Sequence, residues 1–198
     1  TVITMLVGAM AELELGNPAA FATDLGPVID LEAQQMLQRH ALRMDREATL
    51  LASCERKAEH DKGYFFAPRV YEIARLSQLP EEVFGPVLHI IRYAVQDMPK
   101  VLADINASGY GLTLGIHSRI NGFVDEVFEA TNVGNTYINR NMVGAVVGVN
   151  PFGGQGLSGT GPKAGGPHYL ALFALEKTRT VNVVAKGGNT QLFNLQER

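Results

Sequence analysis

The sequence predicts an α/β fold in which a largely parallel open sheet is flanked by helices. Apolar runs typical of strands alternate along the chain with amphipathic segments of about ten residues, the order found in parallel sheets. Residues 119–130 give the clearest helix, because their apolar side chains recur three, four, seven and eight positions apart. Residues 87–93 form an apolar run typical of a buried strand.

Composition limits the classes of function. The 198 residues are 46% hydrophobic and 19% charged, as in a globular chain with a real core. A net charge of −3 without a basic run gives no support for binding to nucleic acid or to an anionic membrane. No apolar run approaches the roughly 20 residues that a membrane-spanning helix needs. Cys54 is the single cysteine, which favours a reducing, cytoplasmic compartment, and no metal-binding motif occurs.

The first third of the chain is predicted to hold two helices. Residues 2–15 carry an apolar stripe at helical spacing, and Gly16-Asn17-Pro18 ends it. Asp30 is predicted to cap the N-terminus of a helix over residues 31–44. One face of this helix carries Leu37, Ala41 and Met44. His40 lies near that face, and we expect a structural role for it because no partner occurs at ligand spacing.

Three strands are expected next, over residues 48–53, 65–73 and 87–93, with a turn at Asp61-Lys62-Gly63 between the first two. Cys54 follows the first strand. A catalytic thiol needs a nearby base or a helix N-terminus to form its thiolate. The neighbouring Glu55 and Glu59 would instead raise the thiol pKa if they lie close. We therefore expect that Cys54 is not a nucleophile.

The second half of the chain continues the alternation. Helices are expected over residues 98–105, 119–130 and 168–176, and strands over 112–117, 133–139 and 178–185, before a short apolar piece at 192–195. Asn135 and Asn139 flank one of these strands and are expected to bond to the backbone. The last strand is expected either at a sheet edge or as an arm that pairs with another chain.

A glycine-rich segment covers residues 142–166. It could be a plain surface loop, but Phe152 lies directly beside the glycines, and loops on rigid scaffolds often bind ligands. Residues 154–159 also spell G-x-G-x-x-G, the dinucleotide-binding fingerprint. That fingerprint must open a helix, which the glycines and prolines of residues 160–167 prevent. A Rossmann fingerprint or a phosphate-binding loop is therefore disfavoured here.

Glu82 and Phe84 lie two residues apart on a turn that Gly85-Pro86 holds at the start of a strand. Such a carboxylate and ring could hold a sugar diol and a flat ring. An acidic turn with a core phenylalanine explains the same residues equally well. Both interpretations remain open on the residues alone.

Four motifs in order resemble the aldehyde dehydrogenase family. They are Glu82-Val83-Phe84-Gly85-Pro86-Val87; Tyr110-Gly111-Leu112-Thr113 with Gly115-Ile116; Gly134-Asn135-Thr136-Tyr137-Ile138-Asn139-Arg140; and Pro151-Phe152-Gly153-Gly154 through Ser158-Gly159. Within this family, Gly144-Ala145 and Gly165-Gly166-Pro167-His168-Tyr169 resemble the glutamate-semialdehyde (1-pyrroline-5-carboxylate) dehydrogenases. Residues 184–190 resemble the dehydrogenase region of the bifunctional bacterial proline utilisation A proteins.

The resemblance implies NAD as cofactor and a small-molecule aldehyde as substrate. It implies that Glu82 accepts hydrogen bonds from the nicotinamide-ribose hydroxyls and that Phe84 packs near the nicotinamide ring. Gly144 and Ala145 would anchor the substrate carboxylate, and Phe152 would wall its aliphatic part. FAD would belong only to a separate proline dehydrogenase domain of a bifunctional parent. NADP remains an alternative, because the discriminating residues belong to the Rossmann domain.

The family's cysteine nucleophile, its oxyanion-binding asparagine, its glutamate and its Rossmann domain would all precede Thr1, and Cys54 does not occupy the nucleophile's motif. The resemblance therefore implies no catalytic residue here. Residues 1–176 are expected to be the C-terminal portion of the catalytic domain, and residues 177–198 an oligomerisation strand and tail of a homo-oligomer. The fragment is expected to be inactive alone. The alternatives are another aldehyde dehydrogenase, or a non-catalytic α/β association module.

Overall fold

The computed structural model describes residues 1–146, 148–159 and 161–182. The α-helices are α1 (Val2–Ala11), α2 (Leu31–Glu47), α3 (Met98–Ala107) and α4 (Asn121–Ala130). The strands are β1 (Thr49–Ser53), β2 (Arg69–Glu72), β3 (Val87–Ile90), β4 (Tyr110–Gly111), β5 (Thr113–Ile116), β6 (Asn135–Ile138) and β7 (Gln155–Gly156). Short 3₁₀ helices are η1 (Ala58–Lys62), η2 (Leu76–Gln78), η3 (Val95–Asp97) and η4 (Leu170–Phe173). Within the described ranges, no helix is long and apolar enough to cross a bilayer.

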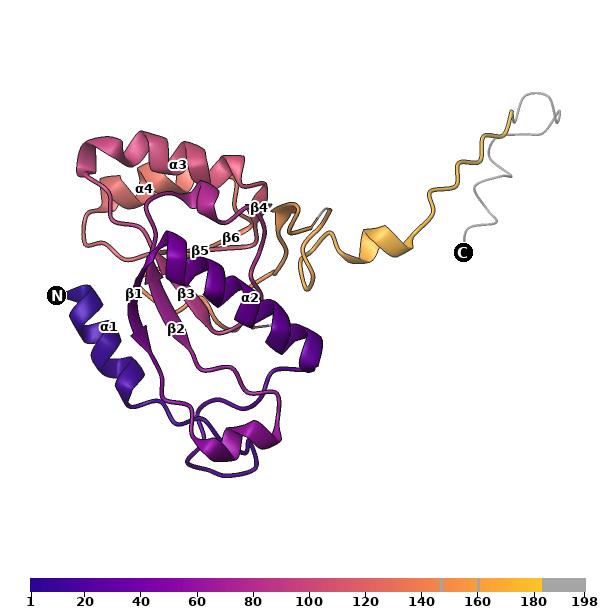
Figure 1. Cartoon of the computed structure of the whole chain (residues 1–198). Helices are drawn as coiled ribbons and strands as arrows, with labels where there is room; N and C mark the ends of the chain where they lie inside the picture. The colour runs from indigo at the N-terminus through magenta and orange to yellow at the C-terminus, as the bar shows by residue number, and fades with distance from the viewer. Residues whose placement is uncertain (147, 160, 183–198) are drawn as a thin grey trace.

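The strands form open sheets, which confirms the α/β class. The largest sheet has the order β1-β2-β3, with β1 antiparallel and β3 parallel to β2. β5 and β6 form a second, parallel pair, and β4 pairs antiparallel with β7. Parallel pairing is therefore carried by β2–β3 and β5–β6. In Figure 1, α3 and α4 lie together beside the β5–β6 pair, and the yellow segment after η4 extends away from the body.

Helix α2 follows its prediction closely. The Asp30 carboxylate accepts a hydrogen bond of 2.8 Å from the Ala33 backbone N–H, which satisfies one otherwise unpaired donor of the first turn. The predicted apolar face is buried, with Leu37, Ala41 and Met44 all inside. Leu37 and Ala41 pack with Phe66, and Met44 packs with Tyr71 and Ile73 of the sheet. The helix continues to Glu47, beyond the predicted end.

Helix α4 buries a narrower face than its sequence pattern predicts. Val124 and Val127 pack into a core with Met98, Leu102 and Ile116. Ile120 and Phe128, which were expected on the same face, are 68% and 57% exposed. Ile120 precedes the helix in an extended conformation, and Phe128 lies about 100° around the helix from Val127. The buried stripe therefore centres on the two valines.

Two predicted helices are shorter than expected. The first ends at Ala11 because Glu14 and Leu15 pair instead with residues 24 and 25, through bonds such as Asp24 N–H to Glu14 O at 2.9 Å. The helix expected over residues 168–176 is only η4, whose Leu170 and Phe173 are 80% and 74% exposed. A short helix without packing on its apolar side chains is marginal.

The predicted strands also end earlier or begin later than their apolar runs. The run at residues 65–73 pairs only over β2, and the run at 87–93 only over β3. Residues 178–182 form no strand, and residues 183–185 and 192–195, where the rest of the predicted C-terminal strand and the last apolar piece fall, lie outside the described residues. The turn predicted at Asp61-Lys62-Gly63 is the end of η1.

Candidate functional site

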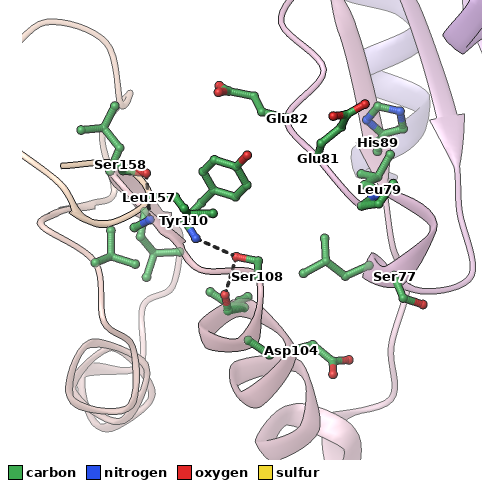
Figure 2. Close-up of a pocket in the computed structure, with 18 of the residues that line it drawn as sticks. Ser77, Leu79, Glu81, Glu82, His89, Asp104, Ser108, Tyr110, Leu157 and Ser158 are labelled. Atoms are coloured by element: carbon green, nitrogen blue, oxygen red, sulfur yellow. Dashed lines mark hydrogen bonds between the residues drawn. The ribbon is translucent and has the colours of Figure 1, made fainter.

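A cavity of about 1030 Å³ lies between the turn that follows β2, the C-terminal end of α3 and strands β4 and β5 (Figure 2). Its lining combines apolar walls such as Leu79 and Leu114 with carboxylates, hydroxyls and an imidazole. The residues that carry these groups are Ser77, Glu81, Glu82, His89, Asp104, Ser108, Tyr110, Thr113 and Ser158, and the cationic Arg75 and Lys100 also line the cavity. A concave apolar space with a few converging polar groups is the usual form of a small-molecule site.

The turn before β3 presents Glu82 and Phe84 to solvent. Glu82 lines the cavity, while Phe84 is 81% exposed and lies outside its lining. Val83, between them, packs against the Leu37 cluster. Because Val83 takes the inward position, its neighbours are directed outward. The interpretation of Phe84 as a core residue is therefore wrong, and its ring is free to contact a ligand.

His89 of β3 connects this cavity to helix α2. Its Nε2 lies 2.9 Å from Nε2 of His40, and the two rings meet edge to face. Burial lowers the pKa of His89 to about 4, with smaller contributions from His40 and Arg43. Burial also lowers the pKa of His40, again helped by Arg43. The sequence had offered no partner for His40, because the two residues lie 49 positions apart and on different elements.

The glycine-rich segment is held against two strands. Phe152 and Ala164 exchange backbone hydrogen bonds of 3.0 and 2.9 Å. The Ser158 hydroxyl accepts a bond of 3.0 Å from the Gly111 N–H at the edge of the cavity (Figure 2). The amide of Asn135 donates to Gly153 O, also at 3.0 Å. Asn135 and Asn139 both bond to backbone groups, as the sequence predicts.

The G-x-G-x-x-G hexapeptide does not form a dinucleotide-binding turn. Its second and third residues form β7, which pairs with β4. Gly156 has φ +60°, and a Cβ there would overlap Gly109 O. In the described stretch that follows, residues 161–169, no helix begins. The predicted exclusion of a Rossmann fingerprint is confirmed.

The predicted substrate-binding residues lie in the first part of the glycine-rich segment. Gly144 is exposed with φ +82°, and Ala145 and Phe152 are half-buried. Neither the Gly144 nor the Ala145 N–H donates a hydrogen bond to another described residue. Two adjacent free donors suit an anion. These three residues are not part of the cavity that Glu82 lines, so the structure does not bring the two predicted groups into one pocket.

Cys54 lies elsewhere, at the end of β1 beside a second cavity of about 260 Å³. Its Sγ donates a hydrogen bond of 3.4 Å to Met10 O, and burial raises the pKa of its thiol. The rise was expected from nearby glutamates, and its cause is instead burial. His60 borders this cavity, but its Nδ1 accepts from Lys57 N–H and its Nε2 faces Leu15 O. No free base is therefore offered to the thiol by His60. Among the described residues, no group of three or more metal-ligating side chains occurs.

Comparisons with known proteins give consistent matches. A sequence model of the aldehyde dehydrogenase family matches residues 1–179. The chain is 51% identical over 173 residues to "Bifunctional protein PutA" of Escherichia coli K12, covering 85% of this chain and 13% of that protein. It is 38% identical over 181 residues to "1-pyrroline-5-carboxylate dehydrogenase" of Bacillus thuringiensis, covering 89% of this chain and 34% of that protein.

Solved structures agree. A crystal structure of bifunctional proline utilization A (PutA) matches with a TM-score of 0.86 at 53% identity, over 93% of this chain and 19% of that one. A 1-pyrroline-5-carboxylate dehydrogenase from Thermus with bound NAD matches with a TM-score of 0.75 at 36% identity, over 87% of this chain and 33% of that one. The chain thus spans a minor part of each of these relatives.

Proposed function

The chain belongs to the aldehyde dehydrogenase family, and we propose that it is part of an NAD-dependent enzyme that oxidises L-glutamate γ-semialdehyde to glutamate in proline catabolism. The observation that carries the proposal is the 51% identity over 173 residues to a protein named PutA. A bifunctional parent of this kind would carry FAD in a separate proline dehydrogenase domain. We place the enzyme in the cytoplasm, in keeping with the single cysteine.

Glu82 and Phe84 are the proposed cofactor contacts. A carboxylate that lines a cavity can accept hydrogen bonds from a ribose diol, and an exposed ring two residues away offers a flat apolar face. These properties fit the nicotinamide-ribose portion of NAD. When bound, NAD supplies the hydride acceptor of the oxidation. The turn before β3 holds both side chains outward because Val83 is packed inward.

Gly144, Ala145 and Phe152 are the proposed substrate contacts. The N–H groups of Gly144 and Ala145 have no acceptor among the described residues, so they are available to a carboxylate. Phe152 is half-buried and fixed by its backbone bonds to Ala164, so its ring can wall an aliphatic chain. A substrate with a carboxylate and a short aliphatic chain fits this set of contacts.

We propose that the thiol nucleophile is not supplied by residues 1–198. The single cysteine, Cys54, has a raised pKa, donates to Met10 O and lies beside a different cavity. A nucleophilic cysteine needs a depressed pKa. This chain would then contribute one wall of the site, and the rest of the parent polypeptide would contribute the reacting groups. Residues 177–198 are proposed to take part in homo-oligomerisation.

The test is NADH formation from glutamate semialdehyde, measured for the parent protein and for this chain alone, with circular dichroism to establish folding. We expect turnover by the parent and none by the folded chain. A parent that does not oxidise the semialdehyde would refute the proposed substrate. Replacing Ala145 with Leu should lower activity on the semialdehyde far more than on an aliphatic aldehyde without a carboxylate. Equal losses would favour a different aldehyde substrate.

A further inference from the structure

Lys163 is half-buried, and its ammonium group is directed onto the fold. Its Nζ donates to Gly134 O at the start of β6 and lies 3.5 Å from Asn135 Oδ1. In residues 1–146, 148–159 and 161–182, no carboxylate forms an ion pair with it. Charge-assisted hydrogen bonds are stronger than those between neutral groups. A lysine whose ammonium group bonds to a backbone carbonyl and an amide oxygen can therefore hold the backbone in position.

Asn135 completes the arrangement from the other side. Its side chain is buried, at 8% exposure. Its amide nitrogen donates at 3.0 Å both to Leu112 O and to Gly153 O, while its oxygen faces Lys163. All polar atoms of this amide therefore serve to join three segments. Asn135 itself belongs to β6, and its partners belong to the residue before β5 and to the glycine-rich segment.

The backbone of the glycine-rich segment passes so close to the start of β6 that no side chain fits between them. A Cβ on Gly134 would overlap Gly153 O. Lys163 lies next to Ala164, which pairs with Phe152 through two backbone bonds. The contacts of Lys163 and Asn135 thus fix both arms of the loop that carries Phe152. Further along, Leu157 and Ser158 of the same loop line the cavity of Glu82.

We propose that Lys163 and Asn135 are positioning residues that hold the Phe152 loop, and with it the substrate wall, against β6. The inference rests on the proposed function of Phe152, Gly144 and Ala145. The position of Lys163 in the chain, among the last glycines of the segment, gives no hint of this role. We call this pair of residues, Lys163 and Asn135, the clamp. Loss of the Lys163 ammonium group should loosen residues 151–164 and weaken binding of the semialdehyde, while the chain stays folded.

The test uses the parent protein with Lys163→Met, with Lys163→Arg to retain a cationic donor, and with Lys62→Met as the matched control at an exposed lysine. Hydrogen exchange of the peptide covering residues 151–164 reports the clamp independently of activity. KM and kcat for glutamate semialdehyde and for an aliphatic aldehyde without a carboxylate report its consequence. We expect faster exchange in Lys163→Met. We also expect the KM for the semialdehyde to rise about tenfold, which is the change in affinity that corresponds to losing one charge-assisted hydrogen bond.

The outcomes distinguish two claims: that Lys163 holds the Phe152 loop in place, and that this loop forms part of the substrate wall. Unchanged exchange in Lys163→Met would overturn the clamp whatever the kinetics. Faster exchange with a raised KM for both aldehydes, reversed in part by Lys163→Arg and absent in Lys62→Met, supports it. Faster exchange with an unchanged KM for both aldehydes would overturn the role at the substrate wall. Faster exchange in a parent that does not oxidise the semialdehyde would refute the proposed function but leave the clamp intact.

The variant Asn135→Asp tests the other member of the clamp. It keeps the shape of the side chain but replaces the amide nitrogen, which donates both hydrogen bonds, with a carboxylate oxygen that cannot donate. It should also speed exchange.

Discussion

The Nε2 atoms of His40 on α2 and His89 on β3 lie 2.9 Å apart. Only one of the two atoms can carry the hydrogen that lies between them, so the ring that accepts this hydrogen cannot gain a proton at Nε2 without breaking the bond. Arg43 adds positive charge nearby, Glu47 opposes it at His40, and Tyr71 stacks on His89. The pair therefore joins α2 to the sheet only while at least one of the two imidazoles is neutral and can accept the hydrogen bond.

This pair predicts acid sensitivity of the fold. The folded-state pKa of His89 is lowered to about 4, and that of His40 is also lowered. Between pH 6.5 and 4 the unfolded chain therefore binds more protons than the folded one, and stability falls as pH falls. Urea unfolding across this range should show the loss, and His89→Phe should flatten it. His168→Gln, at an exposed histidine, should leave the profile unchanged, and an identical profile for His89→Phe would contradict the account.

The core beneath α2 predicts a large cost for truncation at Leu37. This side chain is fully buried and packs with Ala41 and Phe66. Leu37→Ala should lower the free energy of unfolding by about 2–5 kcal/mol. Leu42→Ala, on the same helix but 59% exposed, should change it by less than about 0.5 kcal/mol. Comparable losses in denaturant unfolding of the two variants would show that α2 does not pack as described.

Two glycines should respond to alanine with opposite signs. Gly134→Ala forces a Cβ into Gly153 O, so it should destabilise the fold by about 1–3 kcal/mol and loosen the Phe152 loop. Gly122 lies in α4 with nothing within 4 Å of its added Cβ. Gly122→Ala should therefore stabilise by roughly 0.5–1 kcal/mol. Thermal unfolding midpoints check both, and a neutral Gly134→Ala would show that the loop does not contact β6.

Cys54 should behave as a structural thiol. Burial raises its pKa, so it should react with iodoacetamide more slowly than a free thiol at pH 8. Cys54→Ser in the parent protein should leave NADH formation unchanged. Abolished turnover in that variant would place the nucleophile at Cys54 and require new assignments for every motif.

Features set by neighbouring residues were predictable from the sequence. The Asp30 cap, the buried face of α2 and the backbone bonds of Asn135 and Asn139 all follow from local residue types. The outward direction of Phe84 could not be predicted from the sequence, because it depends on Val83 packing against the distant Leu37. His89 and Lys163 were missed for the same reason, since their partners lie 49 and 28 positions away.

The predicted helix near residue 170 fails for a related reason. An amphipathic stretch of chain forms a lasting helix when its apolar face is buried, and in η4 the apolar side chains are exposed. The glycine-rich segment shows the opposite case. Its composition predicts an irregular loop, yet bonds to Asn135, Gly111 and Gly134 fix its course. The helix is not formed because packing on distant residues is missing, and the loop is ordered because hydrogen bonds to distant residues are present.

The most direct test of the central claim compares Glu82→Gln and Ala145→Leu in the parent protein, with Glu126→Gln as an exposed control on α4. Steady-state kinetics with NAD and glutamate semialdehyde separate the two roles. We predict that Glu82→Gln raises the KM for NAD, that Ala145→Leu raises the KM for the semialdehyde, and that Glu126→Gln changes neither. If neither Glu82→Gln nor Ala145→Leu alters these constants, this chain does not form a wall of the active site.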